Sequence, residues 1–391
     1  MFHNFNDHID RKNTYSTQWD FISDRFGSAD ILPFSISDTD FQAPQKVLDQ
    51  LHQVVDHGVF GYSRWNHSDF KQTITNYYQR YHSTKVEEDW VIYSPSILYS
   101  ISVLLRMLTE KEDGVLVFDP MYDAFIKVIQ KNERKIVSVP LKREEQYAID
   151  FILLEEKLAK CKVFLLCSPH NPTGKVFSKA ELTEIIRLCK KYQVYLLSDE
   201  IHSDLILFDN LHYASLNWYN DYDRIILLNS ASKTFNVPAL GGSYGLIPEQ
   251  TLREAFLVQT RERDFVNSPN ITGITATMTA YNYCQNYVTE LVRYTENNMR
   301  ELQDYLQKQF PAIIFDLPQS TYLAWLDFRG LPFSDDELQQ ALVEVGKVGI
   351  MRGDVYGDGG QGFLRMNVGC PKEKMFEGLH RVKRSLDFLN S

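Results

Sequence analysis

The chain has 391 residues, of which 44% are hydrophobic and 24% are charged, and its net charge is −10. This is ordinary globular composition, and the length allows two domains. The acidic balance argues against binding to nucleic acid or to anionic membranes, because both attract clustered Lys and Arg. We therefore expect neither as a partner.

The five cysteines are odd in number and form no C-x-x-C pair. Neither a disulfide framework nor a zinc site is indicated, so we expect no metal. Residues 1–16 lack the apolar core of a signal peptide, and no apolar run approaches the roughly 20 residues of a membrane helix. These observations predict a cytoplasmic protein.

Helical and strand patterns alternate along the first two thirds of the chain. A helix is expected at 47–56, ending at His57-Gly58. The clearest later helix covers 179–192, where Ser178 and Glu181 form an S-x-x-E capping box. Mostly apolar runs, typical of strands buried on both faces, lie at 115–118, 163–167, 194–198, 225–229 and 243–247. This alternation predicts an α/β fold whose mostly parallel sheet is flanked by helices.

The pattern changes near residue 286. A long polar helix (286–309), a strand (322–328), a helix capped by Ser334 and Glu337, and another strand (363–368) follow in order. We expect a large domain over 46–285 and a smaller α+β domain over 286–391. The segment 1–45 is expected to pack with the smaller domain.

Polar residues follow four of the predicted strands. The segments are DPMY (119–122), SPHNPTG (168–174), DEIH (199–202) and SASKT (230–234). In a parallel sheet, ligands bind at the carboxyl ends of the strands, so these segments should meet at one edge. An aromatic ring, an amide, a carboxylate, hydroxyls and a lysine would then converge there.

Pyridoxal 5′-phosphate (PLP) requires such a set of groups. Its aldehyde bonds to a lysine, and its pyridine nitrogen is kept protonated by a carboxylate. Its phosphate needs hydroxyls and backbone N–H groups, ideally at a helix N-terminus, and its ring needs a stacking partner. The predicted cofactor is therefore PLP.

Three ordered motifs, SPHNPTG, SDEIH and SASKTFN, resemble those of fold-type I PLP enzymes of the aminotransferase class I/II group. The segments FSISDTDFQAP (34–44), HGVFGYSRW (57–65) and NVPALGGSYG (236–245) resemble the C–S β-lyase branch, the cystathionine β-lyase or MalY/PatB type. The resemblance spans nearly the whole chain. Residues 239–243 lack the arginine that many aminotransferases place there for the phosphate, which agrees with the lyase branch.

The resemblance implies a role for each matching residue. Lys233 would form the Schiff base and move the substrate proton, with help from a tyrosine such as Tyr122 or Tyr62. Arg365 would clamp the substrate carboxylate, which suits its two-pronged guanidinium. Tyr62 would reach the active site of a neighbouring subunit in a homodimer. The cofactor would be held by Lys233, Asp199 at the ring nitrogen, Asn171 and His202 near the 3-hydroxyl, Tyr122 stacked on the ring, and Ser230, Ser232, Ser96, Ile97 and Leu98 at the phosphate. Tyr62 would also bind the cofactor, in the site of the neighbouring subunit.

The implied reaction is α,β-elimination from L-cystathionine or L-cysteine, which yields a thiol (homocysteine or sulfide), pyruvate and ammonia. An aminotransferase on the same scaffold is the alternative enzyme, and the motifs around Lys233 do not separate the two. A regulatory binding protein is an alternative of another class. Without their motifs, Asp199 would be interpreted as a helix cap and His202 as an ordinary packed residue. Asp38 and Asp40 are assigned no chemistry.

Overall fold

The computed structural model describes residues 3–266 and 268–391. The helices are α1 (Ser23–Phe26), α2 (Gln45–His57), α3 (Ser68–Tyr81), α4 (Ile97–Leu108), α5 (Asp123–Lys131), α6 (Phe151–Leu158), α7 (Lys179–Tyr192), α8 (Gln250–Val258), α9 (Ile271–Tyr283), α10 (Gln285–Gln309), α11 (Asp335–Ala341) and α12 (Lys372–Leu389). The strands are β1 (Leu32–Pro33), β2 (Val91–Ser94), β3 (Gly114–Asp119), β4 (Lys135–Pro140), β5 (Cys161–Cys167), β6 (Tyr195–Asp199), β7 (Ile225–Asn229), β8 (Ser243–Leu246), β9 (Leu323–Asp327), β10 (Val348–Gly349), β11 (Met351–Arg352) and β12 (Phe363–Asn367).

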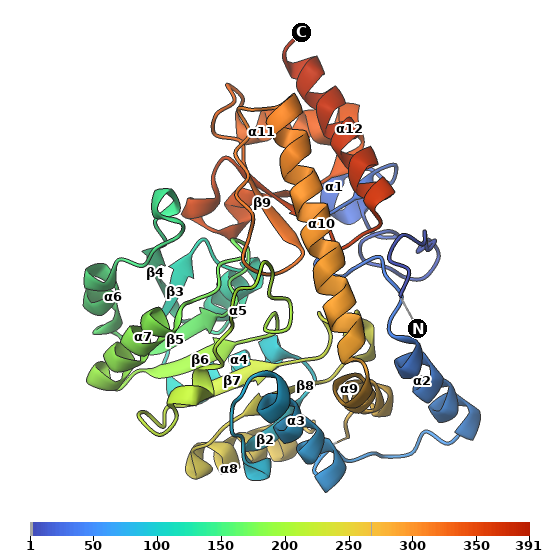
Figure 1. Ribbon diagram of the computed structural model, residues 1–391. Helices are drawn as coiled ribbons and strands as arrows, with labels where there is room; N and C mark the ends of the chain where they lie inside the picture. The colour runs from blue at the N-terminus through green and yellow to red at the C-terminus, as the bar shows by residue number, and fades with distance from the viewer. Residues whose placement is uncertain (1–2, 267) are drawn as a thin grey trace.

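A seven-stranded sheet forms the centre of the larger part of the molecule (Figure 1), with the strand order β2-β8-β7-β6-β5-β3-β4. Strands β3 to β7 run parallel to their neighbours within this group, whereas β8 runs antiparallel to both β2 and β7. The predicted α/β fold with a mostly parallel sheet is confirmed. The parallel order brings the carboxyl ends of β5, β6 and β7 side by side, which is where the site lies.

Two strands of this sheet were missed by the sequence analysis. Strand β4 lies at the sheet edge and is only partly buried, and its sequence includes Lys135 and Pro140. Strand β2 has only four residues. Both strands lie at the edges of the sheet, where the apolar run typical of a central, fully buried strand is short or interrupted.

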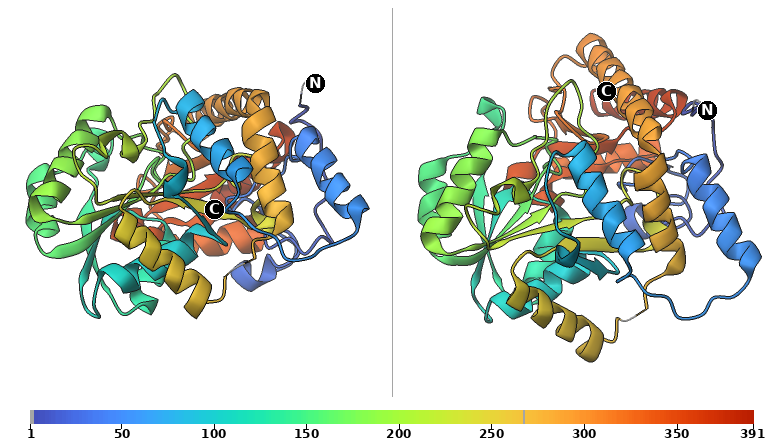
Figure 2. Two further views of the ribbon diagram at one scale, coloured as in Figure 1. Left: turned by 90° about the horizontal axis from the view of Figure 1, so that it is seen from below. Right: turned by 60° about the horizontal axis from the view of Figure 1, so that its bottom comes forward.

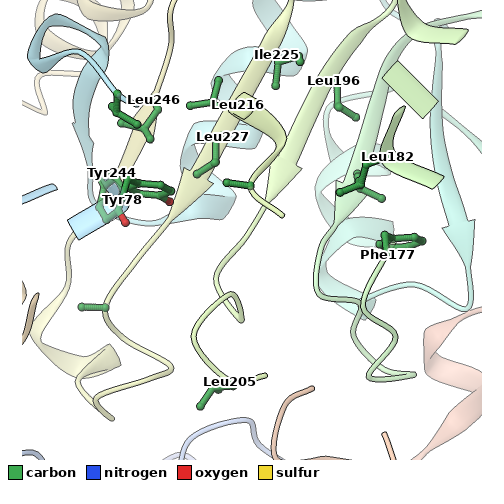
Figure 3. Packing of buried hydrophobic residues seen from close by; sticks show 14 of the residues in the cluster. Tyr78, Phe177, Leu182, Leu196, Leu205, Leu216, Ile225, Leu227, Tyr244 and Leu246 are labelled. Carbon is green, nitrogen blue, oxygen red and sulfur yellow. The ribbon is translucent and has the colours of Figure 1, made fainter. Parts of the chain in front are cut away.

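Hydrophobic side chains cover both faces of the sheet. Along β5, Phe164 and Leu166 pack into one cluster with residues of α3, α6, α7 and α9, while Val163 and Leu165 pack into another with residues of α4, α5 and α8. This is the two-residue alternation of a strand buried on both sides. Figure 3 shows part of the first cluster, in which Leu182 of α7 lies near Leu196 and Phe177 beside the strands.

The capping box of α7 forms as predicted: Ser178 Oγ accepts from the backbone N–H of Glu181, and the Glu181 carboxylate accepts from that of Ser178. The same pair of bonds links Ser334 and Glu337 at the start of α11. Each box satisfies backbone donors that a helix start otherwise leaves free. Both helix starts could therefore be located from the sequence.

The long helix α10 runs from the large sheet to the C-terminal part of the chain, where α11 and α12 pack around a second sheet (Figures 1 and 2). This sheet is antiparallel, with the order β11-β12-β9. Near it, β1 pairs in parallel with β10, and Phe34 is buried among C-terminal residues. The domain boundaries at 45 and 285 stay a prediction. Among the described residues, no helix combines the length and the apolar character needed to cross a lipid bilayer.

Candidate active site

A cavity of about 190 Å³ opens at the carboxyl ends of β5, β6 and β7. The lining includes ten of the twelve residues that the sequence analysis named as site residues; the two exceptions are Arg365 and Tyr62. The ten are Ser96, Ile97, Leu98, Tyr122, Asn171, Asp199, His202, Ser230, Ser232 and Lys233. The parallel register of the strands, which sets their ends side by side, is the reason that these distant segments meet.

The lysine is held by a residue that the sequence analysis did not select. Nζ of Lys233 donates to the backbone oxygen of Ser37 at 2.8 Å and to its hydroxyl at 2.9 Å. Removal from water, opposed by the charge of Asp38, reinforced by that of Arg365 and opposed again by that of Asp199, lowers the pKa of Lys233 to about 8. A lysine with such a pKa is partly neutral near neutral pH and is able to act as a base.

Asp199 ends strand β6 and faces the same cavity. Its Oδ1 accepts from the backbone N–H of Ile201 at 3.2 Å, a bond within a local turn rather than a helix cap. Burial raises the pKa of Asp199 to about 7, although the Ile201 bond and the charge of Lys233 pull it down. A buried carboxyl group with a raised pKa is partly protonated near neutral pH. A cationic partner beside it would lower the pKa again and favour the charged carboxylate.

Two buried polar atoms near the cavity lack a partner within the described part of the chain: Nδ1 of His202 and Nε of Arg365. Burial, with the positive charges of Lys233 and Arg365, lowers the pKa of His202 to about 3, so its ring is neutral. Buried polar groups are ordinarily hydrogen-bonded. These two atoms therefore indicate a polar ligand in the cavity.

The part of the cavity wall at the start of α4 has groups that suit an anion. Ser96 is the N-cap of α4, and its hydroxyl accepts from the backbone N–H of Tyr99. The N–H groups of Ile97 and Leu98 lie in the first turn of α4, where a helix has no internal acceptors for them. Across from them, the hydroxyl of Ser230 donates to the backbone oxygen of Gly242 at 2.9 Å.

Arg365 lies on β12, just outside the cavity lining, and is 4% exposed. Nη1 donates to Oδ1 of Asn171 at 3.0 Å, and Nη2 donates to the backbone oxygen of Ser35 at 2.9 Å. The guanidinium also lies over the ring of Tyr356, 4.8 Å from its centroid. The arginine is thus joined directly to a residue of the cavity.

Tyr62 does not lie in the cavity of its own chain. Its side chain is fully exposed and lies in the segment between α2 and α3. The sequence analysis expected it to act in a neighbouring subunit, and its exposure leaves it free to do so.

Several cavity residues were not selected from the sequence. Ser37 had a weak signal, because it belongs to the FSISDTDFQAP segment that supported the family resemblance. Gly241 and Gly242 belong to NVPALGGSYG in the same way. Their positive φ angles of 71° and 94° let the backbone turn past the cavity wall. The remaining unselected lining residues are Pro95, Cys167, Ile201, Pro238 and Ser243.

The groups around the cavity fit PLP. A carboxylate that favours a cation suits a protonated pyridine nitrogen. A free helix start with hydroxyls nearby suits a phosphate, and a lysine amine of lowered pKa suits an aldehyde. The Tyr122 ring on the wall suits a flat aromatic ring.

Comparison with known proteins extends these observations to the whole chain. The family model described as aminotransferase class I and II matches residues 29–382. Protein MalY of Escherichia coli (strain K12) is 42% identical over 378 residues, which are 95% of each chain. Cystathionine beta-lyase PatB of Bacillus subtilis (strain 168) is 36% identical over 387 residues, which are 98% of this chain and 100% of that protein.

A solved structure gives the same result for the fold. Cystalysin from Treponema denticola, whose crystal structure contains a pyridoxal 5′-phosphate cofactor, superposes with a TM-score of 0.95 at 30% identity and covers 100% of both chains. The family match, the sequence relatives and this structure all extend over nearly the entire length. The chain belongs to the aminotransferase class I and II family.

Proposed function

We propose that this protein is a PLP-dependent C–S β-lyase that cleaves L-cystathionine, L-cysteine or both by α,β-elimination. The products are a thiol (homocysteine or sulfide), pyruvate and ammonia. The observation that carries the proposed reaction is the similarity along the full length to a relative named cystathionine beta-lyase. The presence in one cavity of a lysine of lowered pKa and the buried carboxylate of Asp199 supports the PLP-dependent chemistry.

The cavity residues divide into groups that would hold different parts of the cofactor. Asp199 would pair with the ring nitrogen, and Tyr122 would lie against the ring. Asn171 and His202 would bind near the 3-hydroxyl. The phosphate would be bound by the hydroxyls of Ser230 and Ser232 and by the backbone at Ser96, Ile97 and Leu98.

When bound, PLP withdraws electrons from the substrate's α-carbon and so makes the Cα proton removable. The proton transfers are carried out by Lys233. The neutral amine of Lys233 takes the Cα proton, and the electron pair forms the Cα–Cβ double bond as the Cβ–S bond breaks. The ammonium of Lys233 then returns its proton to the departing sulfur. Hydrolysis of the remaining unsaturated amino acid gives pyruvate and ammonia.

Arg365 would orient the substrate through its α-carboxylate. Two of its nitrogens are already bonded to Asn171 and Ser35, so the side chain is held in place before the substrate arrives. Nε, which is buried and has no partner among the described residues, leaves donor capacity for a carboxylate oxygen. Fixed orientation of this kind supplies much of the advantage of an enzyme over solution.

A homodimer is part of the proposal. Tyr62 would complete the site of the second subunit, and its neighbours Val59 and Phe60 are also exposed, at 71% and 63%. An exposed group of large apolar side chains is typical of a protein–protein interface. The tyrosine hydroxyl would add a further donor or a proton carrier to the partner's cavity.

The test is pyruvate formation from L-cystathionine by the PLP-loaded protein with no 2-oxo acid present, followed with a coupled dehydrogenase. Pyruvate from the wild type but not from Lys233→Ala would support both the elimination and the role of the lysine. If pyruvate is absent with both cystathionine and cysteine, and turnover appears only when a 2-oxo acid is added, the protein is an aminotransferase and the proposal fails.

A further inference from the structure

Residues 35–41, which we call the strap, place Ser37 in the cavity wall, where it contacts Lys233. The lysine amine has two acceptors on this single residue, the backbone oxygen at 2.8 Å and the hydroxyl at 2.9 Å. Ser37 is 7% exposed and lies 196 positions before Lys233 in the sequence. The contact is therefore a product of the tertiary fold.

The strap is held in place by side chains from the C-terminal part of the chain. The hydroxyl of Tyr322 donates to the backbone oxygen of Ser37 at 2.9 Å, the same oxygen that receives the lysine. The amide nitrogen of Asn367 donates to the backbone oxygens on either side, those of Ile36 and Asp38. These hydrogen bonds hold the Ser37 carbonyl in position.

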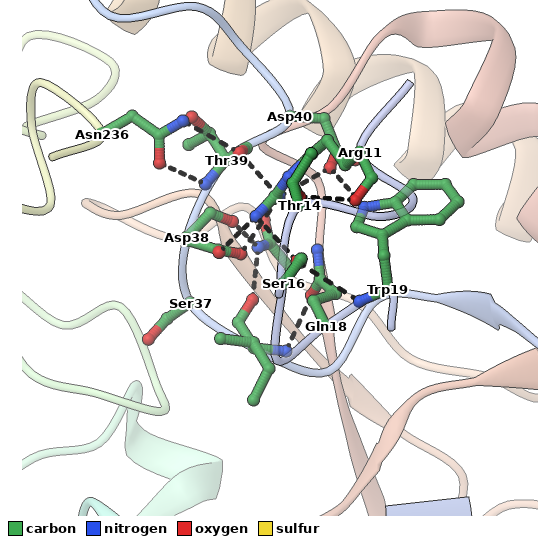
Figure 4. Close-up of polar contacts among 12 residues, drawn as sticks. Arg11, Thr14, Ser16, Gln18, Trp19, Ser37, Asp38, Thr39, Asp40 and Asn236 are labelled. Atoms are coloured by element: carbon green, nitrogen blue, oxygen red, sulfur yellow. Dashed lines mark hydrogen bonds and ion pairs between the residues drawn. The ribbon is translucent and has the colours of Figure 1, made fainter. Parts of the chain in front are cut away.

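The other side of the strap is bonded to the N-terminal segment and to the loop that follows Lys233 (Figure 4). Arg11 forms an ion pair with Asp38 at 2.7 Å and donates to the backbone oxygen of Thr39 at 3.0 Å. Asn236, three residues after Lys233, accepts from the Thr39 N–H at 3.1 Å and donates to its carbonyl at 3.0 Å. In the figure the Ser37 side chain points away from the Arg11 cluster.

The contact between Ser37 and Lys233 matters for the proton transfers that the lysine carries out. A lysine ammonium has three N–H donors. Ser37 receives two of them, which leaves one for the substrate. While Lys233 is bonded to the cofactor, its nitrogen carries too few hydrogens to make both bonds to Ser37. The two bonds therefore form only at the stage of the reaction at which the ε-amine is free.

We propose that Ser37 is a positioning residue for Lys233: its carbonyl and hydroxyl bind two N–H groups of the free ε-amino group, so that the lone pair of the neutral amine, or the third N–H of the ammonium, is directed toward the substrate. This inference deepens the proposed function and rests on it, because it assumes that Lys233 carries the proton from Cα to the departing sulfur. The Ser37 hydroxyl binds neither substrate nor cofactor in this scheme; it acts only through the lysine.

Three charged groups act on the lysine amine: Asp38 on the strap, Asp199 at the end of β6 and Arg365 on β12. The neutral ring of His202 lines the same cavity, and the hydroxyl of Tyr322 bonds to the Ser37 oxygen that receives the lysine. Replacement of Ser37 by alanine leaves all five in place and removes one acceptor of the ammonium. Because the acceptor stabilises the charged form, its loss lowers the pKa of Lys233.

The experiment measures the lysine directly, in the protein freed of PLP and without substrate. A trace of acetic anhydride modifies the neutral amine, and peptide mass spectrometry gives the extent of Lys233 modification at each pH. We expect the midpoint for Ser37→Ala to fall by about one pH unit, the effect of one hydrogen bond to a charged group. Ser37→Thr keeps the hydroxyl and should restore the wild-type midpoint.

Thr39→Val is the matched control. Its hydroxyl lies on the same strap, two residues away, and has no hydrogen-bond partner within the described residues. Its loss should leave the Lys233 midpoint unchanged. Melting temperatures of all the variants identify any that fold poorly. If Ser37→Ala does, Ser37→Cys, which replaces the hydroxyl by a weaker acceptor of similar size, carries the comparison.

In the PLP-loaded enzyme, Ser37→Ala should lower kcat by roughly tenfold and leave KM nearly unchanged, since proton transfer is affected and substrate binding is not. An unchanged midpoint together with an unchanged kcat would overturn the proposal. A midpoint that shifts in a protein without lyase activity would retain the positioning role and reject the proposed reaction, so the two failures are distinguishable.

Discussion

Arg365 Nη1 donates to Oδ1 of Asn171 at 3.0 Å, and this bond joins two residues that are 194 positions apart. One lies on β12 of the small antiparallel sheet, and the other follows β5 of the large sheet. The arginine proposed to bind the substrate and the amide proposed to bind the cofactor are therefore positioned as one unit. Removal of either partner should disturb both functions.

Arg365→Lys is expected to raise KM for L-cystathionine by roughly 10- to 100-fold with a smaller effect on kcat. A lysine has one charged nitrogen and cannot bind Asn171, Ser35 and a carboxylate with a planar fork. Steady-state kinetics measure the change. Arg381→Lys, in an exposed ion pair with Glu377 on α12, is the control and should leave KM unaltered. Equal KM values for Arg365→Lys and the wild type would refute the carboxylate clamp.

Asp199→Asn should remove a pH dependence from the stability of the PLP-free protein. The pKa of Asp199 is raised in the folded state to about 7, so the carboxyl stabilises the fold below its unfolded pKa, and this contribution is lost as pH rises toward 7. Asparagine does not titrate. Relative to the wild type, the variant should gain stability between pH 4 and pH 8, by at most about 4 kcal/mol.

Urea denaturation of the PLP-free proteins at several pH values measures this difference. With PLP bound, the same variant should lose activity by about 10²- to 10³-fold, because the cofactor's cationic nitrogen no longer has its buried partner. A stability difference that does not vary with pH would contradict the raised pKa of Asp199.

Glu200→Ala should destabilise the protein by about 3–5 kcal/mol. The Glu200 side chain is completely buried, lies 2.9 Å from Nε2 of His212, and accepts from the Ser198 hydroxyl and the Ser215 N–H. Truncation leaves these donors buried without an acceptor. Glu184→Ala, which removes an exposed pair with Arg187, should change the free energy of unfolding by less than about 1 kcal/mol. Similar urea curves for both variants would show that the Glu200 network is unimportant.

Tyr62→Ala and Lys233→Ala should each be nearly inactive alone and recover activity when mixed. In a hybrid dimer, one site receives Lys233 from the first variant and Tyr62 from the second, so random exchange should restore about one quarter of wild-type activity. Pyruvate assays after brief denaturation and joint refolding measure the recovery. If the mixture stays as inactive as its components, Tyr62 does not act across subunits.

The amino-acid sequence by itself determined the α/β class, the starts of two helices and the polar residues after β3, β5, β6 and β7 that line the cavity. These properties are local: buried parallel strands have apolar runs, capping boxes have a fixed spacing, and the polar segments follow directly after the strands. Because the strands are parallel, the segments that follow them meet at one edge of the sheet, and no knowledge of long-range contacts is needed to predict this. Lys233, Asp199 and Asn171 could be selected for this reason.

Other features were decided only by the tertiary structure. The two hydrogen bonds of Ser37 to Lys233 join residues 196 positions apart, and they depend on Tyr322, Asn367 and Arg11, which come from both ends of the chain. Likewise, no local pattern relates Arg365 to Asn171. Such contacts arise when separate elements pack against each other, and their distances are set by the packing of the whole core rather than by any one segment.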